Sequence, residues 1–301
     1  MLNKGYIYLS LAQIAVATNV ILGKFLSFSL SSFVYVGSRF FVSSIIFLIL
    51  FAGQKQKKIL TTNGNKKSLL LLIGYCLSGG FLFNILFFEG LSSTSATSAG
   101  IIGSVLPCFI AFMAFVFLQE SLSSKKILSI ILACLGILIL NTGFNNNFSL
   151  TFNRGDIFIL IAMIPQAIYS IISRKARGQF HIITAALMLN ISALILFFPI
   201  NFKILENDQT QLNALLDTFN ITLIFFSGVC SFLFFYLWTL GLQKVEASIA
   251  AIFGSIFPLF TTILAVTFLE ETLSISDTIA MALIISSILL GAQSATKNTK
   301  V

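Results

Sequence analysis

The nine residues Ala99-Gly100-Ile101-Ile102-Gly103-Ser104-Val105-Leu106-Pro107 return 151 positions later as Ala250-Ala251-Ile252-Phe253-Gly254-Ser255-Ile256-Phe257-Pro258. Positions 99–123 and 250–274 align without a gap, and 12 of these 25 positions are identical. The identities include a glycine, a proline and a glutamate (Glu120 and Glu271), which two unrelated apolar helices rarely share in the same register. The chain therefore contains an internal duplication.

The composition around this repeat is that of a membrane protein. Hydrophobic residues make up 57% of the 301 residues, charged residues make up 9%, and the mean hydropathy is +1.00. A soluble domain carries about a quarter charged residues, so most side chains of this chain must face lipid or one another. We therefore do not interpret the net charge of +8 as a sign of nucleic-acid binding.

Ten apolar runs are each long enough, or nearly so, to cross a bilayer as a helix. They lie at 5–24, 31–52, 68–90, 95–118, 125–142, 156–173, 181–200, 218–241, 246–269 and 275–293. Their uniform apolarity lacks the alternation of a barrel strand, so we predict an all-α integral membrane protein. The predicted units are a first repeat at 1–142, a connecting loop at 143–155, a second repeat at 156–296 and a tail at 297–301.

Each repeat holds five predicted helices, and because five is odd, the second repeat enters the membrane from the opposite side. This inverted arrangement supplies two equivalent conformations around a site near the membrane midplane, and it is typical of transporters. The basic residues predict the orientation, because 14 of the 18 Lys and Arg residues fall on one side when both ends are cytoplasmic. With 14 Lys against 4 Arg, the composition favours the inner membrane of a bacterium with an AT-rich genome.

Several motifs resemble the EamA domains of the drug/metabolite transporter superfamily. They are Asn19 to Lys24, Ser38-Arg39-Phe40-Phe41, Ser93 to Ala96, Phe117 to Ser123, Leu237 to Leu242 and Leu269 to Ser274, with the prolines at 107 and 258. The resemblance covers essentially the whole chain as two EamA units. It implies a transporter of amino acids, drugs or other metabolites, with some relatives importing nucleotides or cofactors, and it does not select a substrate.

Two ionisable residues, Arg39 and Glu89, fall inside the predicted helices, where a charge is costly. Arg39 is expected either to hold the bundle together or to contact substrate. Glu89 is expected to be an interfacial carboxylate that reaches water, or else a proton or cation site. Because Lys24 ends the first helix on the same side, Lys24 and Glu89 form a candidate gate pair.

The fourth helix of each repeat carries small residues four apart, followed by a proline. These residues are Ala99, Gly103 and Pro107 in the first repeat, and Ala250, Gly254 and Pro258 in the second. Small residues let helices approach closely in lipid, and proline permits a bend, so we predict close packing that is compatible with a hinge. The glutamates that follow, Glu120, Glu270 and Glu271, are expected to be solvated or structural loop residues.

A polar stripe in the sixth predicted helix indicates either cavity lining or hydrogen bonding between helices. With matching polar residues elsewhere, the substrate-cavity candidates are Thr18, Asn19, Arg39, Asn84, Glu89, Ser104, Gln166, Tyr169, Ser170, Tyr236, Trp238 and Ser255. Trp238 is also consistent with an interfacial belt residue. The four cysteines lie in apolar runs and are expected to be small core residues.

These observations favour a secondary transporter of a small amino acid-like, cofactor-like or other amphipathic or zwitterionic metabolite, working by alternating access. The alternative is an importer or exchanger of nucleotide- or cofactor-type substrates rather than an exporter. An intramembrane lipid-modifying enzyme is disfavoured, because the chain has one histidine and no DxxD or HExxH motif. We expect no catalytic residues, metal or cofactor, and as partners the substrate and the lipid bilayer, with no nucleic acid, in a monomer or homodimer.

Overall fold

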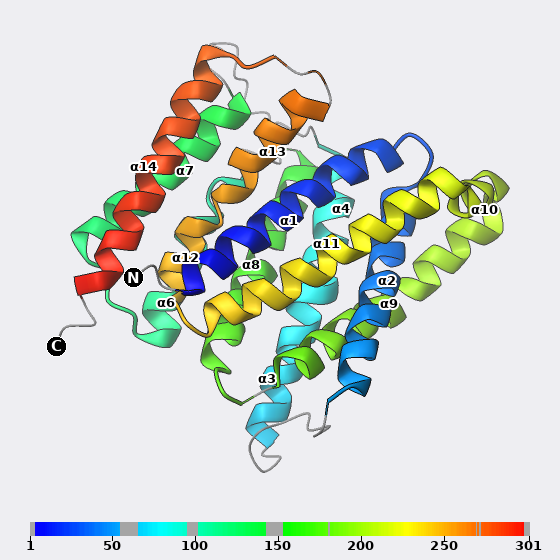
Figure 1. The fold of residues 1–301 in the computed structure, drawn as a ribbon, viewed down its shortest axis with the longest axis horizontal. Coiled ribbons are helices and arrows are strands. Elements are labelled where there is room, and N and C mark those ends of the chain that lie inside the picture. The colour runs from blue at the N-terminus through cyan, green and yellow to red at the C-terminus, as the bar shows by residue number, and fades with distance from the viewer. Residues whose placement is uncertain are drawn as a thin grey trace.

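The computed structural model describes residues 4–54, 66–94, 102–142, 153–179, 181–268, 270 and 272–297, and within these residues it contains helices and no strand (Figure 1). The helices of the first repeat are α1 (Lys4–Leu26), α2 (Ser32–Ala52), α3 (Lys66–Cys76), η1 (Leu77–Leu82), α4 (Phe83–Leu91), α6 (Leu106–Leu118) and α7 (Ser124–Thr142). Those of the second are α8 (Arg154–Lys175), α9 (Ile182–Asn207), α10 (Gln209–Leu216), α11 (Thr218–Leu242), α12 (Ala247–Phe253), α13 (Ile256–Phe268) and α14 (Ile275–Lys297).

Nine spans in the described part of the chain are long and apolar enough to cross a membrane. The third span joins α3, η1 and α4 (Lys66–Leu91), and another joins α12 and α13 (Ala247–Phe268). The helix α6 has 13 residues, about 20 Å of length, which is short of the roughly 30 Å hydrocarbon core. The residues at 95–101 that would extend it lie outside the described residues, so a tenth span stays a prediction.

Matching helices of the two repeats run in opposite directions. The start of α1 lies beside the end of α11, because a Cβ added at Gly241 would come within 3.3 Å of the Gly5 carbonyl oxygen. The end of α8 lies at the same place, since Arg174 donates to the Leu242 carbonyl at 3.2 Å. Likewise α2 ends where α9 begins, with Gln54 hydrogen-bonded to His181. This antiparallel relation is the one that an inverted repeat requires.

The fourth span of the second repeat is broken rather than bent. Its two segments, α12 and α13, are separated by a turn at Gly254 and Ser255, and the equivalent turn at Ser104 and Val105 precedes α6. The helix is therefore interrupted before the proline, whereas a bend was expected at the proline itself. Pro107 and Pro258 lie in the first turn of α6 and α13, where backbone N–H groups have no partner within the helix and proline sacrifices no hydrogen bond.

The packing role predicted for the small residues holds only in part. Ala250 is fully buried. In contrast, a Cβ added at Gly103 would meet no heavy atom within 4 Å among the described residues, and one added at Gly254 would meet chiefly the backbone of its own helix, at Ala251. Ala99 lies outside the described residues. The two glycines thus mark the break and not a close contact between helices.

The third span contains a π-helical turn that the sequence did not predict. In η1 the residues Gly79 and Gly80 face the second repeat, where Gly79 lies against the ring of Tyr169 and a Cβ added at Gly80 would lie 3.0 Å from the Leu189 carbonyl oxygen. A π-helical turn inserts an extra residue into the helix and is frequent at functional sites. The two glycines let α8 and α9 pass close to this turn.

The segment 201–217, which lies between the apolar runs predicted at 181–200 and 218–241, is largely helical. The helix α9 continues to Asn207, and α10 follows at once. Asp208 caps α10 by accepting a hydrogen bond from the backbone N–H of Thr210 at 2.9 Å. Hydrogen bonds from the Thr210 hydroxyl and backbone hold the pKa of Asp208 below its usual value. Helix capping by a polar residue explains why this hydrophilic stretch is ordered.

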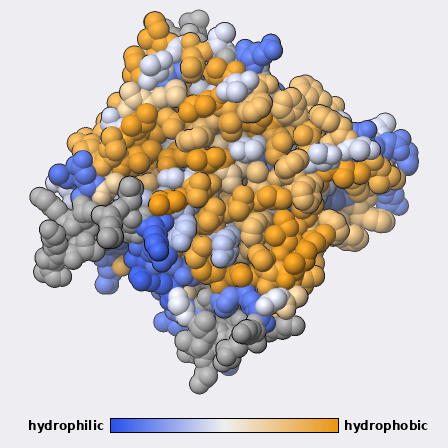
Figure 2. All heavy atoms as spheres, viewed as in Figure 1, coloured by the Kyte–Doolittle hydropathy of each residue, from blue (hydrophilic) through white to orange (hydrophobic). Residues whose placement is uncertain are grey.

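The outer surface matches a lipid environment. Figure 2 shows a broad apolar face over the middle of the molecule, with hydrophilic residues gathered toward its lower left and around α10 at its right edge. Fully exposed apolar side chains such as Phe28 and Ile275, each 80% exposed, need lipid or protein to cover them.

Gly155 generates a test of this packing. A Cβ at Gly155 would lie 2.6–2.8 Å from backbone atoms of Gly90, Ser93 and Thr94, which cannot rotate away. We therefore expect Gly155→Ala to destabilise the bundle by about 1–3 kcal/mol, the usual cost of overpacking. Thermal unfolding in detergent measures this loss. The control is Gly53→Ala, whose Cβ would lie 3.7 Å from its nearest neighbour, and an equal loss in both variants would contradict the packing.

Candidate functional site

Arg39 points into the bundle. Phe41 and Leu48, on the same helix, are 54% and 52% exposed and define its lipid face. At 3.6 residues per turn, Arg39 lies about 160–180° around the helix from both. Arg39 therefore lies on the side of α2 opposite these two exposed residues. Its side chain is nevertheless only half-buried.

Neutral groups and aromatic rings surround the Arg39 guanidinium. Its Nη2 donates to the Asn84 Oδ1 at 2.8 Å, and its central carbon lies 5.7 Å and 5.5 Å from the ring centroids of Tyr35 and Phe40. The Nε atom is buried and has no hydrogen-bond partner among the described residues. The ion pairs found in that part of the chain, Lys126–Glu246 and Arg174–Glu120, do not involve Arg39. The structure thus brings together two predicted residues, Arg39 and Asn84, without a counter-charge.

The π-helical turn positions Asn84. Asn84 lies two residues after η1, is 3% exposed, and donates its Nδ2 to the Gly80 carbonyl at 3.0 Å. Its Oδ1 is thereby turned toward Arg39. We refer to Arg39, Asn84, Tyr35 and Phe40 as the central site.

Asn19 joins three helices beside the central site. Its Nδ2 donates to the Ser231 Oγ at 2.9 Å, and its Oδ1 accepts from the Tyr35 hydroxyl at 2.7 Å and from Ser227. Asn19 is 3% exposed. Its polar atoms are therefore used in hydrogen bonds between α1, α2 and α11. Thr18, its neighbour, donates to the backbone of its own helix at Ile14.

The polar stripe of α8 is buried except at Gln166. Ser170 donates to the Gln166 carbonyl at 3.2 Å, so this hydroxyl bonds within its own helix. Tyr169 is 1% exposed, its ring lies 5.1 Å from that of Tyr75, and its hydroxyl has no hydrogen-bond partner among the described residues. Gln166 is half-buried.

The remaining polar candidates are spread over the bundle. Trp238 is 3% exposed and stacks on Phe234, so the interfacial-belt alternative is wrong for this residue. Tyr236 is half-buried and stacks on Phe232. Ser104 and Ser255 are both buried in the breaks of their spans, and Ser255 donates to the Ile252 carbonyl at 2.6 Å.

The candidate gate pair is not formed in this structure. The side chains of Lys24 and Glu89 are both exposed, and neither belongs to an ion pair in the part of the chain that is described. The exposure of Glu89 agrees with an interfacial carboxylate that reaches water.

A second polar cluster lies at the end of the bundle where α1 begins and α14 ends. Glu120, which follows α6, accepts hydrogen bonds from the backbone N–H groups of Ala247 and Ser248 at 2.7 and 3.0 Å and from the Ser248 hydroxyl at 2.6 Å. It therefore caps α12, in the other repeat, and its charge suits the positive end of that helix. Its side chain is 8% exposed, so of the two expected roles, solvated or structural, Glu120 has the structural one.

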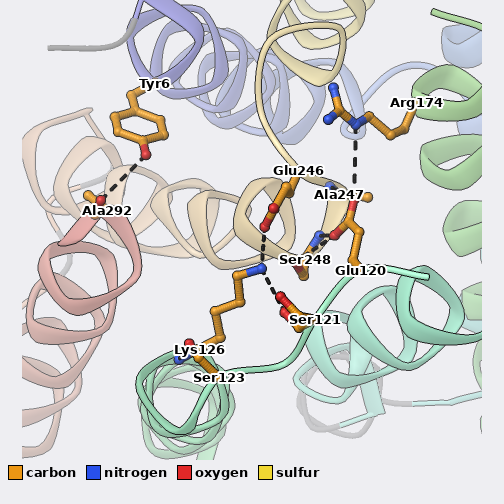
Figure 3. Close-up of polar contacts among 10 residues, drawn as sticks. All are labelled: Tyr6, Glu120, Ser121, Ser123, Lys126, Arg174, Glu246, Ala247, Ser248 and Ala292. Carbon is orange, nitrogen blue, oxygen red and sulfur yellow. Dashed lines mark hydrogen bonds and ion pairs between the residues drawn. The ribbon is translucent and has the colours of Figure 1, made fainter. Parts of the chain in front are cut away.

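Two basic residues complete this cluster, as Figure 3 shows. Lys126, whose side chain is fully buried, pairs with Glu246 and donates to the Ser121 carbonyl at 2.8 Å. Arg174, from α8, lies 4.0 Å from the Glu120 carboxylate and donates to two carbonyls at the end of α11. We name Glu120, Lys126, Arg174 and Glu246 the latch cluster. Its members Glu120, Arg174 and Glu246 line a surface cavity of about 470 Å³ that Gln119 and Arg177 also border.

One indication of the role of Glu120 in this cluster comes from the internal repeat of the sequence. Glu120 and Glu271 are identical across the 151-residue offset, and a carboxylate held in register with a proline and glycine indicates a structural role. Its hydrogen-bond partners Ala247 and Ser248, however, lie 127 and 128 positions away, and no local pattern identifies them.

Known proteins similar to this chain are transporters by name. The model of the EamA-like transporter family matches residues 3–142 and again residues 153–292. The uncharacterized transporter YetK of Bacillus subtilis is 26% identical over 286 residues, which cover 94% of this chain and 85% of YetK. The uncharacterized transporter YyaM of the same bacterium is 24% identical over 244 residues, covering 75% and 73%. A solved crystal structure at 13% identity shares the fold, with a TM-score of 0.78 over 97% of this chain and 99% of the other.

The Asn19 network makes a prediction about stability. Asn19→Ala removes hydrogen bonds to Ser231, Tyr35 and Ser227 and leaves buried polar groups unpaired, so we expect a loss of about 1–3 kcal/mol. Thr18→Ala is the matched control, because that hydroxyl bonds only its own helix. Thermal unfolding of both variants in detergent checks the difference, and an Asn19→Ala protein as stable as Thr18→Ala would refute it.

Proposed function

Because the chain belongs to the EamA-like transporter family, we propose that it is a secondary transporter that moves a small metabolite by alternating access. It is a multi-pass membrane protein with two repeats. We place it in the bacterial inner membrane with both ends in the cytoplasm, so that the latch cluster lies at the cytoplasmic end. The substrate enters from one side, binds at the central site, and leaves after the two repeats have rearranged.

The observation that carries this proposal is the connection between the repeats at the latch cluster. Glu120 of the first repeat binds the first turn of α12, which belongs to the second. Lys126 and Glu246 join the repeats a second time. Because α12 is one segment of a broken span, it is able to move without bending a continuous helix. Breaking these contacts would open the cytoplasmic end while the rest of each repeat stays intact.

The orientation of the latch cluster rests on the basic residues. Arg174, Lys175, Arg177 and Lys244 gather at this end with Lys125 and Lys126. Cytoplasmic loops of membrane proteins carry an excess of Lys and Arg. The opposite end carries Asp156 and the acidic segment around α10.

Transport in proteoliposomes tests the proposed function. A panel of labelled amino acids, organic acids, nucleosides and cofactors is followed in both directions, with and without a pH gradient. We expect saturable movement of at least one class in vesicles that contain the protein and none in empty vesicles. Movement of no compound in either direction would count against a transporter.

Locking the latch cluster provides a second test. In a variant whose native cysteines are replaced, Glu120→Cys and Ser248→Cys place two thiols where a 2.6 Å hydrogen bond now joins the side chains. A short bis-methanethiosulfonate cross-linker joins each thiol through a disulfide and releases methanesulfinate. It should stop transport, and reduction of the disulfides should restore it, because alternating access needs this end to open. The single-cysteine variants treated in the same way are the controls. Full transport by the cross-linked protein would show that the latch cluster does not open.

A further inference from the structure

We infer that Arg39 is the anion-binding residue of the substrate site, and that the transported metabolite carries a single carboxylate on an apolar body. This inference rests on the proposed function, because it names the substrate class that the central site selects. It follows from the charge, the accessibility and the surroundings of one side chain.

The charge argument comes first. Arg39 lies about eight residues into α2, roughly 12 Å from its start, where insertion of a charge costs about 2.5–3.5 kcal/mol. Buried charges in proteins are normally paired. The described carboxylates that form ion pairs are Glu120 and Glu246, both in the latch cluster, and Arg39 bonds only a neutral amide among the contacts found. A ligand with a negative charge would supply the counter-ion that this part of the chain lacks.

The second step is access. Arg39 is half-buried on the side of α2 opposite Phe41 and Leu48, so a part of its side chain is left uncovered by the described residues. Its Nε–H has no hydrogen-bond partner in the described part of the chain. A guanidinium presents its N–H groups as a planar fork that fits a carboxylate. Asn84 and the rings of Tyr35 and Phe40 hold this fork in position, and its buried Nε–H is left without a partner in the described part of the chain.

The surroundings narrow the ligand to a monoanion with an apolar body. Arg39 is a single cation, whereas a phosphate group at neutral pH carries more negative charge than one guanidinium balances. Next to it lies a chain of aromatic side chains. The Phe40 ring lies 5.9 Å from that of Phe235 and 6.4 Å from that of Phe197, and the Phe81 ring lies 5.1 Å from that of Phe197. A ligand that enters the bundle beside Arg39 would meet these rings, and such apolar surroundings favour a hydrocarbon or aryl group beside the carboxylate.

The positive charge of Arg39 has no equivalent in the second repeat. The position equivalent to Arg39, 151 residues later, is Asn190 in α9. Asn190 is fully buried and neutral, and its Nδ2 donates to the Ala186 carbonyl at 2.8 Å. A residue needed only to hold the second and third spans of a repeat together would be expected in both copies. The charge at Arg39 therefore points to a ligand rather than to a requirement of the repeated fold.

The experiment uses Asn84→Asp as its main variant. This change keeps the shape of the side chain and places a carboxylate where the Asn84 Oδ1 now lies, 2.8 Å from the Arg39 Nη2. The built-in carboxylate would neutralise Arg39 and compete with a bound one. Asn141→Asp in α7 is the matched control, because Asn141 also donates its Nδ2 to the carbonyl four residues earlier, at 2.7 Å against 3.0 Å for Asn84. Arg39→Gln is the complementary variant.

Binding is measured on purified full-length protein as ligand-induced thermal stabilisation in detergent. The probes are 3-phenylpropionate and hexanoate, each beside its neutral amide. We expect the carboxylates to stabilise the wild type and Asn141→Asp, and the amides to bind about tenfold or more weakly, since a charge-assisted hydrogen bond is lost. Asn84→Asp and Arg39→Gln should both lose carboxylate binding by about tenfold or more. Asn84→Asp without ligand should unfold at a higher temperature than Asn141→Asp.

The opposite results overturn the inference. Carboxylate binding that survives in Asn84→Asp, amides that bind as well as carboxylates, or no stabilisation of the wild type by either carboxylate would each exclude the anion site. Size-exclusion profiles identify a variant that fails to fold, and Asn84→Asp decides the question if Arg39→Gln does so. Proteoliposome transport separates the two proposals. Transport of neutral compounds alone would support the transporter function and contradict the anion site. Carboxylate binding without transport would support the anion site and contradict the transporter function.

Discussion

A lipid bilayer offers no hydrogen bonds, so every backbone N–H and C=O group inside it must find a partner in the protein. This chain departs from continuous helices at three described places, namely the breaks near Ser104 and Gly254 and the π-helical turn η1. Each departure needs compensation. In η1 the amide of Asn84 binds the Gly80 carbonyl, and in the break of the second repeat the Ser255 hydroxyl binds the Ile252 carbonyl. The start of the broken span also has N–H groups without a helical partner, and the carboxylate of Glu120 binds them at Ala247 and Ser248. The latch cluster and the central site are both built on these compensating side chains.

The compensation also explains why the two repeats differ in chemistry. Their backbones are related by the 151-residue offset, but the position that matches Lys126 is Asp277, and the one that matches Arg174 is Gly23. Asp277 caps its own helix through Ser274 and not the other repeat. The ion pairs that join the repeats in the described residues are thus found at one end alone. A symmetric scaffold carries an asymmetric set of charges, and under the proposed function the two sides of the membrane are then not equivalent to the substrate.

Glycine and aromatic residues let the helices meet closely around the central site. Gly79 and Gly80 bring η1 against α8 and α9, and the space between the helices is filled by stacked rings such as Phe40 and Phe235. In lipid there is no hydrophobic force between helices, so this close packing and the hydrogen bonds of Asn19 supply the stability of the bundle. The positive charge of the Arg39 guanidinium, placed among such apolar rings, consequently interacts strongly with a nearby negative charge.

The sequence by itself determined the membrane environment, the all-helical class, the duplication and the family resemblance, because these follow from apolar run length, composition and register, which are local properties. It also identified Arg39 and Asn84 as intramembrane polar residues, although not as partners. Only the tertiary structure decided which polar groups meet. Glu120 and Ser248 are separated by 128 positions, and Asn19 and Ser231 by 212. No helical period predicts such contacts, because they depend on how two repeats are laid against each other. The breaks and the π-helical turn were not predicted, because the apolar sequence around them is that of a continuous helix.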